Sequence, residues 1–394
     1  MTSTKAVQQL QSIHVFENQL QNSLSMKWTF PSIGHTLRSY VEKQLNDDHL
    51  SDTHSGVGTE HRFHYHHFDN VWIYRHSSEA PLQTGPAVSP AKQFSIVIAA
   101  KDFNPEKYEM LTKIFVKIYV KTGEIQRLLA YYLTLLIHGS FTVSEDQMNN
   151  CKRFNLDDYE SVAPAVVHNR SPIGIKSVIK MFGLDVILIY TALILKRRVV
   201  VYHHKLDTLL QFVRVLPAFV WHRWPDCYQI LYPCVELQSP AEIGDLTARR
   251  HYIAGFLDTD VESRTDLYDI YVNLAAIEIT VSHGSRDAFA MTKTHKEIAV
   301  FMTRQADRET NTNWDLIQDI CDKNRELIET LKRMATASAK SSPAREGSVG
   351  EEEVLSPETT VGPTLTLEAL KERKLNPNLE NFLWNLAVAE NLCI

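Results

Sequence analysis

The sequence predicts a protein of mixed α+β and α/β class, with an N-terminal module built on one antiparallel sheet, a central α/β module and a C-terminal helical module. Three observations support this prediction. Short strands with alternating apolar and polar residues dominate the first hundred positions. In the middle of the chain, continuous apolar strands alternate with helices, which is typical of parallel or mixed sheets. From about residue 286 onward, apolar residues recur at helical spacing.

The N-terminal module begins with two strands, because residues 12–17 and 25–30 alternate apolar and polar side chains. Pro31 ends the second strand, since proline has no amide hydrogen for the ladder. Leu37, Tyr40 and Val41 then share one face of an amphipathic helix over 34–46. Further strands are expected near 61–68, 70–76 and 94–99.

A well-marked helix start follows these strands. Asn104 can cap the free amides of the first turn, and Pro105 suits the first helical position. Gly123 is placed to end this helix, and a second helix is predicted over 124–138. Strands followed by two helices predict an α+β unit with one antiparallel sheet.

The central module is predicted to begin after a loose segment that runs to about residue 170. Helices are expected at 173–182, 184–196 and 206–215, and strands at 198–202, 228–232, 252–256 and 267–274. The strand at 198–202 contains three consecutive valines, which predicts burial on both faces of a parallel or mixed sheet.

The C-terminal module is predicted to contain a long helix over 313–335 and two shorter helices at 365–374 and 379–392. Between them, residues 336–364 are rich in Ser, Thr, Pro, Gly and Glu, which predicts a disordered insertion. We therefore expect three modules, over 1–139, 140–285 and 286–394.

Composition excludes several classes of function. The net charge of −6 argues against a nucleic-acid-binding protein. Only 14 glycines occur in 394 residues, and no glycine-rich phosphate loop or hydrolase motif is found. Five cysteines without a CxxC pair indicate a reducing compartment. No signal peptide is visible, and the apolar run Val186–Leu195 is too short to span a bilayer, so a cytoplasmic location without a transmembrane segment is expected.

A cluster of histidines is the densest group of metal-ligand side chains. Strand alternation places His64 and His66 on one face and His61 and His67 on the other, so the four cannot converge on one tetrahedral ion. An exposed edge strand is the preferred interpretation. We expect no metal, no cofactor and no catalytic side chain.

Two polar segments have a structural and a functional interpretation. The cations of 196–198 can complement a helix C-terminus or recognise phosphate or an acidic partner. In the segment 221–224, Trp221 and Trp224 flank His222 and Arg223, and such residues anchor interfaces or close cores. Both interpretations stay open for each segment.

The order of motifs in the middle of the chain resembles the central module of DENN-domain proteins. A helix runs directly into the valine strand, and a tryptophan-bearing stretch leads to two further strands. The segments that carry the resemblance are Leu184–Lys196, Arg198–Tyr202, LPAFVWHR at 216–223, YQILYP at 228–233, YIAGF at 252–256 and DLYDIYVNL at 266–274. Segments 101–108, 199–205, 366–371 and 380–390 are similar to one family member in particular.

The resemblance implies a longin-type N-terminal module, a helical downstream module and guanine nucleotide exchange on a Rab GTPase. The family member that these segments resemble implies late endosomes or multivesicular bodies. In the family, the GTPase switches enter a groove between the longin and central modules. The positions expected to contact the GTPase are Arg38, Tyr40, Tyr202, His203, Trp221 and Arg223. Packing between the modules is an equally good explanation for each of them.

Two other functions remain open. The protein can be a non-catalytic scaffold subunit of an endosomal recycling complex, with its amphipathic helices packed on coiled coils. The resemblance to longin–DENN relatives also allows a GTPase-activating role, with Arg62 or Arg75 as the arginine finger. Ser342 and Ser356, each followed by proline, are candidate phosphorylation sites in the insertion.

Overall fold

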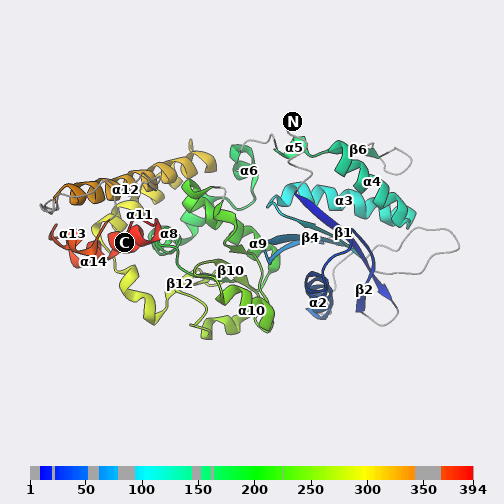
Figure 1. Cartoon of the computed structure of the whole chain (residues 1–394), viewed down its shortest axis with the longest axis horizontal. Helices are drawn as coiled ribbons and strands as arrows, with labels where there is room; N and C mark the ends of the chain where they lie inside the picture. The colour runs from blue at the N-terminus through cyan, green and yellow to red at the C-terminus, as the bar shows by residue number, and fades with distance from the viewer. Residues whose placement is uncertain are drawn as a thin grey trace, which may run out of the picture. The chain divides into compact units, whose positions relative to one another are not determined.

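The computed structural model describes residues 9–19, 23–51, 62–78, 94–143, 152–160, 164–224, 226–341 and 365–393. The chain divides into two compact units, unit 1 over 1–163 and unit 2 over 164–394 (Figure 1). Each unit has its own sheet and its own core. The mixed α+β and α/β class predicted from the sequence is confirmed.

Unit 1 contains the predicted antiparallel sheet, with five strands in the order β2-β1-β5-β4-β3. The strands are β1 (Leu10–Gln19), β2 (Ser23–Phe30), β3 (Arg62–Phe68), β4 (Val71–Ser78) and β5 (Phe94–Ala100). β5 lies in the centre and all seven of its residues are buried. Every pairing in this sheet is antiparallel.

Helices cover both faces of this sheet. α2 (His35–Ser51) packs Tyr40 and Val41 on Phe16, Phe68 and Ile73. α3 (Pro105–Thr122) contacts β4 and β5, and Figure 1 shows it on the opposite face from α2. α4 (Ile125–His138) packs beside α3. Because both faces are covered, polar side chains within the strands are also buried and need partners.

The predicted caps of α3 are confirmed. The Asn104 side chain accepts a hydrogen bond from the Lys107 amide at 3.2 Å. Gly123 ends the helix in the left-handed region with φ of 63°, and its amide donates to the Tyr119 carbonyl at 2.8 Å.

The described residues between 140 and 170 form helices and strands that the sequence did not predict. They include the hairpin of β6 (Ser140–Val143) and β7 (Lys152–Asn155), followed by α5 (Asp157–Glu160) and α6 (Pro164–Arg170). Phe141, Val143 and Phe154 are buried and supply the apolar contact that holds this hairpin. The elements are only four to seven residues long, which is too short for a clear periodicity.

Unit 2 contains a mixed sheet, which agrees with the predicted parallel or mixed sheet. Its strands lie in the order β12-β11-β8-β10-β9. β8 (Val199–Tyr202), β9 (Leu231–Tyr232), β10 (Ile253–Phe256) and β11 (Ile270–Asn273) are parallel, and β12 (Glu278–Val281) pairs antiparallel with β11. The strand expected over 228–232 is only two residues long, because Asp226–Tyr228 form a 3₁₀ turn. β12 was not predicted, and its half-exposed pattern is typical of an edge.

Three helices of unit 2 pack on this sheet: α8 (Val186–Ile194), α9 (Leu206–Val215) and α10 (Pro240–Thr247). α7 (Ile175–Phe182) precedes them and contacts α11 and α12. In the described ranges, the run Ile175–Ile194 is long and apolar enough to cross a membrane by length and composition, but 61% of its most apolar window is buried in the fold. Eight of the nine residues of α8 are buried, as expected for a core helix.

The C-terminal part of unit 2 is helical. It comprises α11 (Lys293–Asp307), α12 (Asn313–Ser341), α13 (Leu367–Lys371) and α14 (Pro377–Ala389). α12 continues for six residues past 335, so the helix enters the segment that was expected to be disordered. The rest of the insertion, with Ser342 and Ser356, lies outside the described residues. The three-module division stays a prediction.

Candidate partner-binding surfaces

The six positions expected to contact a GTPase occupy different environments. On α2, Arg38 is exposed and its Nε lies 2.9 Å from Glu42 Oε1. Tyr40 is only 8% exposed and stacks on Phe68 with ring centroids 4.1 Å apart. Arg38 is therefore available at a surface of unit 1, whereas Tyr40 belongs to the core beneath α2.

Tyr202 and His203 lie at the carboxyl end of the central strand of unit 2. The register places Tyr202 opposite Phe256 of β10 and Asn273 of β11, so three parallel strands end at one level. The carboxyl ends of parallel strands are the usual position of binding sites in α/β sheets. Tyr202 and His203 are each 9% exposed, so they support this edge more than they project from it.

His203 is held by the turn that follows β8. Its Nδ1 lies 2.9 Å from the Lys205 amide, which donates to it. Burial, together with the neighbouring His204 and Lys205, lowers the pKa of His203, so the imidazole is neutral at pH 7. His204 and Leu257 are exposed at this edge, and the exposed fraction of Leu257 is 39%. We call Tyr202, His203, His204 and Leu257 the sheet-end surface.

Arg223 is a structural residue. Its NH1 and NH2 donate to the carbonyls of Leu193 and Ile194 at 2.8 and 2.6 Å, which satisfies the C-terminus of α8. Its guanidinium also forms an ion pair with Glu390, 167 residues away. Burial alone would raise the pKa of Glu390, but the neighbouring His222, with 3.8 Å between Nε2 and Oε1, and the charge of Arg223 lower it to about 2. Arg223 thus ties α8 to the end of α14.

Trp221 belongs to a group of aromatic rings at the surface of unit 2. It stacks on Trp224 with centroids 4.4 Å apart and meets Trp314 edge-on at 5.5 Å. His168 and Tyr228 complete the group, with edge contacts of 5.0 Å to Trp221 and Trp224 respectively. We call these five residues the aromatic patch. Trp224 is 47% exposed, and large exposed aromatic side chains are frequent anchors of protein interfaces.

A buried polar residue fixes the patch from below. Asn324 of α12 is fully buried and accepts a hydrogen bond from Tyr190 of α8 at 2.7 Å. Its amide nitrogen donates to the Phe219 carbonyl at 2.9 Å, at the start of the turn that carries Trp221. Asn324 was not among the residues predicted from the sequence, where its signal is an amide at a core position of an otherwise apolar stripe.

The cations at 196–198 make structural contacts. Arg198 pairs with Asp269, with 3.3 Å between Nε and Oδ2. Arg197 donates to Asn385 of α14 at 2.6 Å. Lys196 follows α8 with φ of 50° and is half-buried. These contacts support the structural interpretation of this segment.

The histidines of β3 are buried, which corrects the expectation of an exposed edge strand. β3 is the edge of the sheet, but His64, His66 and His67 are 8%, 5% and 8% exposed. His67 stacks on Trp72, and His64 Nδ1 lies 2.9 Å from Arg75 NH2. His61 and the side chain of Arg62 lie outside the described residues.

Arg75 is 5% exposed, and NH1 donates to the Gln44 carbonyl at 3.4 Å. An arginine finger must reach out of its own protein, so this packing speaks against Arg75 in that role. In the parts of the chain that the structure describes, no three His, Cys, Asp or Glu side chains are grouped to hold a metal ion.

Comparison with known proteins agrees with the order of motifs. A family model described as stabilization of polarity axis matches residues 174–283, from just before α7 to just after β12. DENN domain-containing protein 10 of Danio rerio is 34% identical over 385 residues, which cover 97% of each chain. The proteins of the same name from Homo sapiens and Dictyostelium discoideum are each 32% identical, over 96% and 97% of this chain and 95% and 97% of theirs.

This similarity extends through both units, including the unit 1 sheet and the C-terminal helices that the family model does not cover. The chain therefore belongs to the DENN-domain family, together with the proteins named DENN domain-containing protein 10.

Proposed function

We propose that this protein is a guanine nucleotide exchange factor for a Rab GTPase. The observation that carries the proposal is similarity to DENN-domain proteins over 97% of the chain. The family's usual role is Rab exchange, and the described surfaces offer contact area rather than a chemical active site. Recruitment to late endosomes is part of the same proposal.

Exchange of this kind needs differential binding and no catalytic side chain. The exchange factor must bind the nucleotide-free GTPase more tightly than the GDP-bound form, because only that difference accelerates GDP release. Each tenfold acceleration requires about 1.4 kcal/mol of such differential binding. Rigid aromatic anchors can supply this energy because they lose little conformational entropy on binding.

Within unit 2, the aromatic patch and the sheet-end surface are the candidate contact areas. Trp224 is 47% exposed and Leu257 39% exposed, while the residues beneath them are fixed by packing. On unit 1, the exposed guanidinium of Arg38 is the candidate. Tyr40, Tyr202, His203 and Arg223 would act by supporting these surfaces.

The test is release of fluorescent GDP from a panel of purified Rab proteins. We expect the wild-type chain to accelerate release from at least one of them. Trp224→Ala and Leu257→Ala should each reduce the exchange rate about tenfold or more, the size typical of an interface anchor. Val388→Ala, which alters an apolar side chain of 53% exposure on α14, is the matched control and should leave the rate unchanged.

Absence of acceleration across the whole panel, with the protein shown to be folded, would overturn the proposal. A scaffold role would then be the second candidate, favoured by the 29-residue helix α12 and its exposed charged face. Stoichiometric recovery of coiled-coil partners that are not GTPases would support it. Accelerated GTP hydrolysis instead of GDP release would indicate a GTPase-activating protein.

Recruitment to late endosomes is tested separately in cells. The tagged chain should co-localise with late-endosomal markers, and removal of the cognate Rab should change its distribution. A uniform cytosolic signal in the presence of the active Rab would contradict this part of the proposal.

A further inference from the structure

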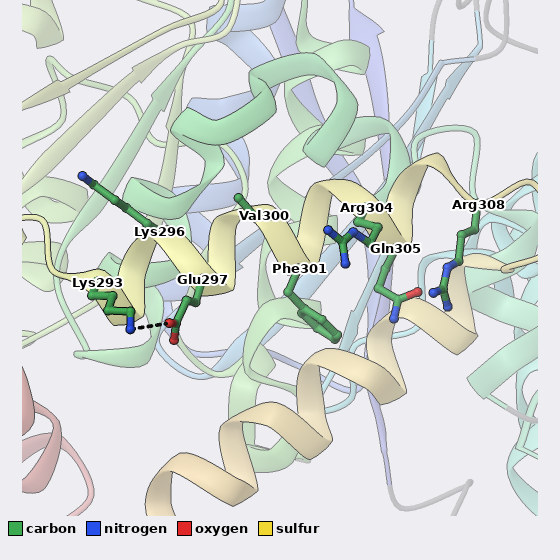
Figure 2. A pocket seen from close by; sticks show the side chains of 8 residues that line it. All are labelled: Lys293, Lys296, Glu297, Val300, Phe301, Arg304, Gln305 and Arg308. Carbon is green, nitrogen blue, oxygen red and sulfur yellow. Dashed lines mark ion pairs between the residues drawn. The ribbon is translucent and has the colours of Figure 1, made fainter.

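A surface groove along α11 lies outside the aromatic patch and the sheet-end surface. It has a volume of about 430 Å³ and is lined by side chains of α11 and by Arg308 just after it (Figure 2). α11 has 15 residues, so the groove follows an axis of about 22 Å. An extended segment of roughly six or seven residues has the same length.

Two rows of side chains, each with a spacing of four residues, form the groove. One row contains Lys296, Val300, Arg304 and Arg308, and the other contains Lys293, Glu297, Phe301 and Gln305. Figure 2 shows the second row projecting from one side of the helix, with Lys296 and Val300 on the adjoining side. Rows of this spacing are the ridges of a helix, and the space between them can receive another side chain.

The charges of the two rows differ. In the second row, Lys293 and Glu297 form an ion pair at 3.7 Å and balance one another. The first row carries three cations and no acid, and Lys296, Arg304 and Arg308 are all exposed. Asp307 and Glu309 are exposed beside Arg308, so the positive potential is strongest at Lys296 and Arg304.

The centre of the groove is apolar. Val300 is 45% exposed and Phe301 is partly exposed, one from each row. Cations therefore flank an apolar centre on both sides along the helix. This pattern complements a segment with one apolar side chain between acidic residues.

We propose that the α11 groove binds a short acidic segment of a partner protein, with one apolar side chain seated against Val300 and Phe301. The acidic residues on either side pair with Lys296 and Arg304. This interaction is additional to nucleotide exchange, and it would allow the protein to hold a second partner while it acts on a GTPase.

A membrane fits this surface less well than a peptide. The apolar atoms line a groove, whereas insertion into lipid requires apolar side chains that project from the surface. Glu297 and the nearby Asp307 would also be pressed against anionic headgroups. A peptide can position its acidic side chains away from Glu297 and Asp307.

Binding is tested by fluorescence anisotropy with the full chain and three labelled eight-residue synthetic peptides. The first has a central leucine between glutamates, the second has serine in place of leucine, and the third has lysines in place of the glutamates. We expect the first peptide to bind at least about fivefold more tightly than the second and the third not to bind. Affinity should fall as the salt concentration rises.

Variants locate the site. The double variant Lys296→Glu/Arg304→Glu should weaken binding of the first peptide by about tenfold or more. Lys323→Glu/Arg325→Glu introduces the same charge change on the exposed face of α12 and should change binding less than twofold. Val300→Gln should remove the preference for leucine over serine. All of these side chains are exposed, and circular dichroism verifies that each variant is folded.

The proposal is overturned if the first peptide does not bind at millimolar concentration, or if the α12 control weakens binding as much as the α11 variant. It is also overturned in favour of a lipid surface if vesicles containing phosphatidylserine, and not the peptide, bind in a manner that depends on Lys296 and Arg304. Because no GTPase is present in these assays, their outcome is independent of the exchange proposal.

Discussion

The two units bury polar groups in different places. In unit 1 most of them lie within the sheet: His14 and Glu17 in β1 and Arg75 in β4 are at most 5% exposed, and only Lys107 and Thr112 of α3 are buried outside it among the described residues. In unit 2 the parallel strands β8 and β10 contain only apolar side chains and tyrosine, and all of them are buried. Its buried polar residues, such as Asn324, lie on helices and turns.

Sheet type and helix cover explain this difference. Antiparallel strands alternate polar and apolar side chains, and in unit 1 α2 and α3 cover both faces, so the polar row is buried as well. Parallel strands are joined by crossover helices that cover both faces of the sheet, so their sequences are apolar throughout. The stability of unit 1 therefore depends on hydrogen bonds inside its sheet, and the stability of unit 2 depends on polar contacts between its helices.

The largest loss of stability is expected for Arg223→Ala in unit 2. The substitution leaves Glu390 without its ion pair and the Leu193 and Ile194 carbonyls without a donor. We expect a loss of about 3–5 kcal/mol, measured by urea unfolding. Arg264→Ala breaks an exposed pair with Asp266 and should cost less than about 1 kcal/mol. Equal losses of unfolding free energy in both variants would contradict a stabilising role for polar contacts between helices.

The next largest effect is expected for Gly255→Ala in β10. A Cβ atom at this position would lie 2.2 Å from the Pro233 carbonyl oxygen and 3.1 Å from the Leu209 side chain. We expect destabilisation by roughly 2–4 kcal/mol, because the neighbouring backbone has to move. Gly244→Ala on α10 has open space around the new methyl group and should stabilise by up to about 1 kcal/mol. A neutral Gly255→Ala would show that this sheet is not tightly packed.

Acidification should weaken both units in the same range of pH. Burial lowers the pKa of His14 in unit 1 and of His295 in unit 2 from 6.5 to about 4. Below pH 6.5 these histidines bind protons in the unfolded chain, whereas in the folded chain they bind protons only near pH 4. The free energy of unfolding therefore decreases as the pH falls from 6.5 to 4. Each histidine should contribute up to about 3 kcal/mol.

Hydrogen exchange at pH values between 4 and 7 can follow the two units separately. His14→Gln retains a partner for Ser12 and Thr29 and should flatten the pH dependence of unit 1 alone. A pH dependence that is unchanged in unit 1 would exclude His14 as the titrating group.

The smallest effect is expected for Glu17→Gln in β1. The carboxylate of Glu17 accepts hydrogen bonds from Lys27 at 2.7 Å and from the Tyr119 hydroxyl. Glutamine keeps an acceptor for Tyr119, and Lys27 is 31% exposed, so its ammonium can turn to water. We expect a loss of about 1–2 kcal/mol by urea unfolding. A loss larger than that of Arg223→Ala would reverse the comparison between the units.

Much of the fold was predictable because local patterns determined it. Alternation located β1 and β2, strand-forming residues located β4 and β5, and Asn104 and Gly123 marked both ends of α3. The three valines of β8 correctly predicted a strand buried on both faces. The hairpin of β6 and β7 was missed, because strands of four residues are stabilised by contacts such as Phe141 with Phe154 rather than by their own pattern.

The candidate surfaces were less predictable than the fold. The sequence drew attention to Trp221 and Trp224, but it did not show that His168 of α6 and Trp314 of α12 join them in the aromatic patch. It left open whether Arg223 contacts a partner or packs inside the fold, and the structure shows contacts of Arg223 with α8 and Glu390. Residue type and spacing show what a side chain can do, and they do not show which distant partner it meets.

By itself, the sequence determined the mixed class, most of the longer helices and strands and the membership of a family, because these depend on patterns of residue order along the chain. Only the tertiary structure decided which polar groups are paired and which cations are free. Glu390 forms an ion pair with Arg223, 167 positions away in the sequence, whereas Lys296 and Arg304 are exposed along α11. The physical reason is that burial makes an unpaired charge costly, so packing determines which charges need a partner and which remain at the surface for another molecule.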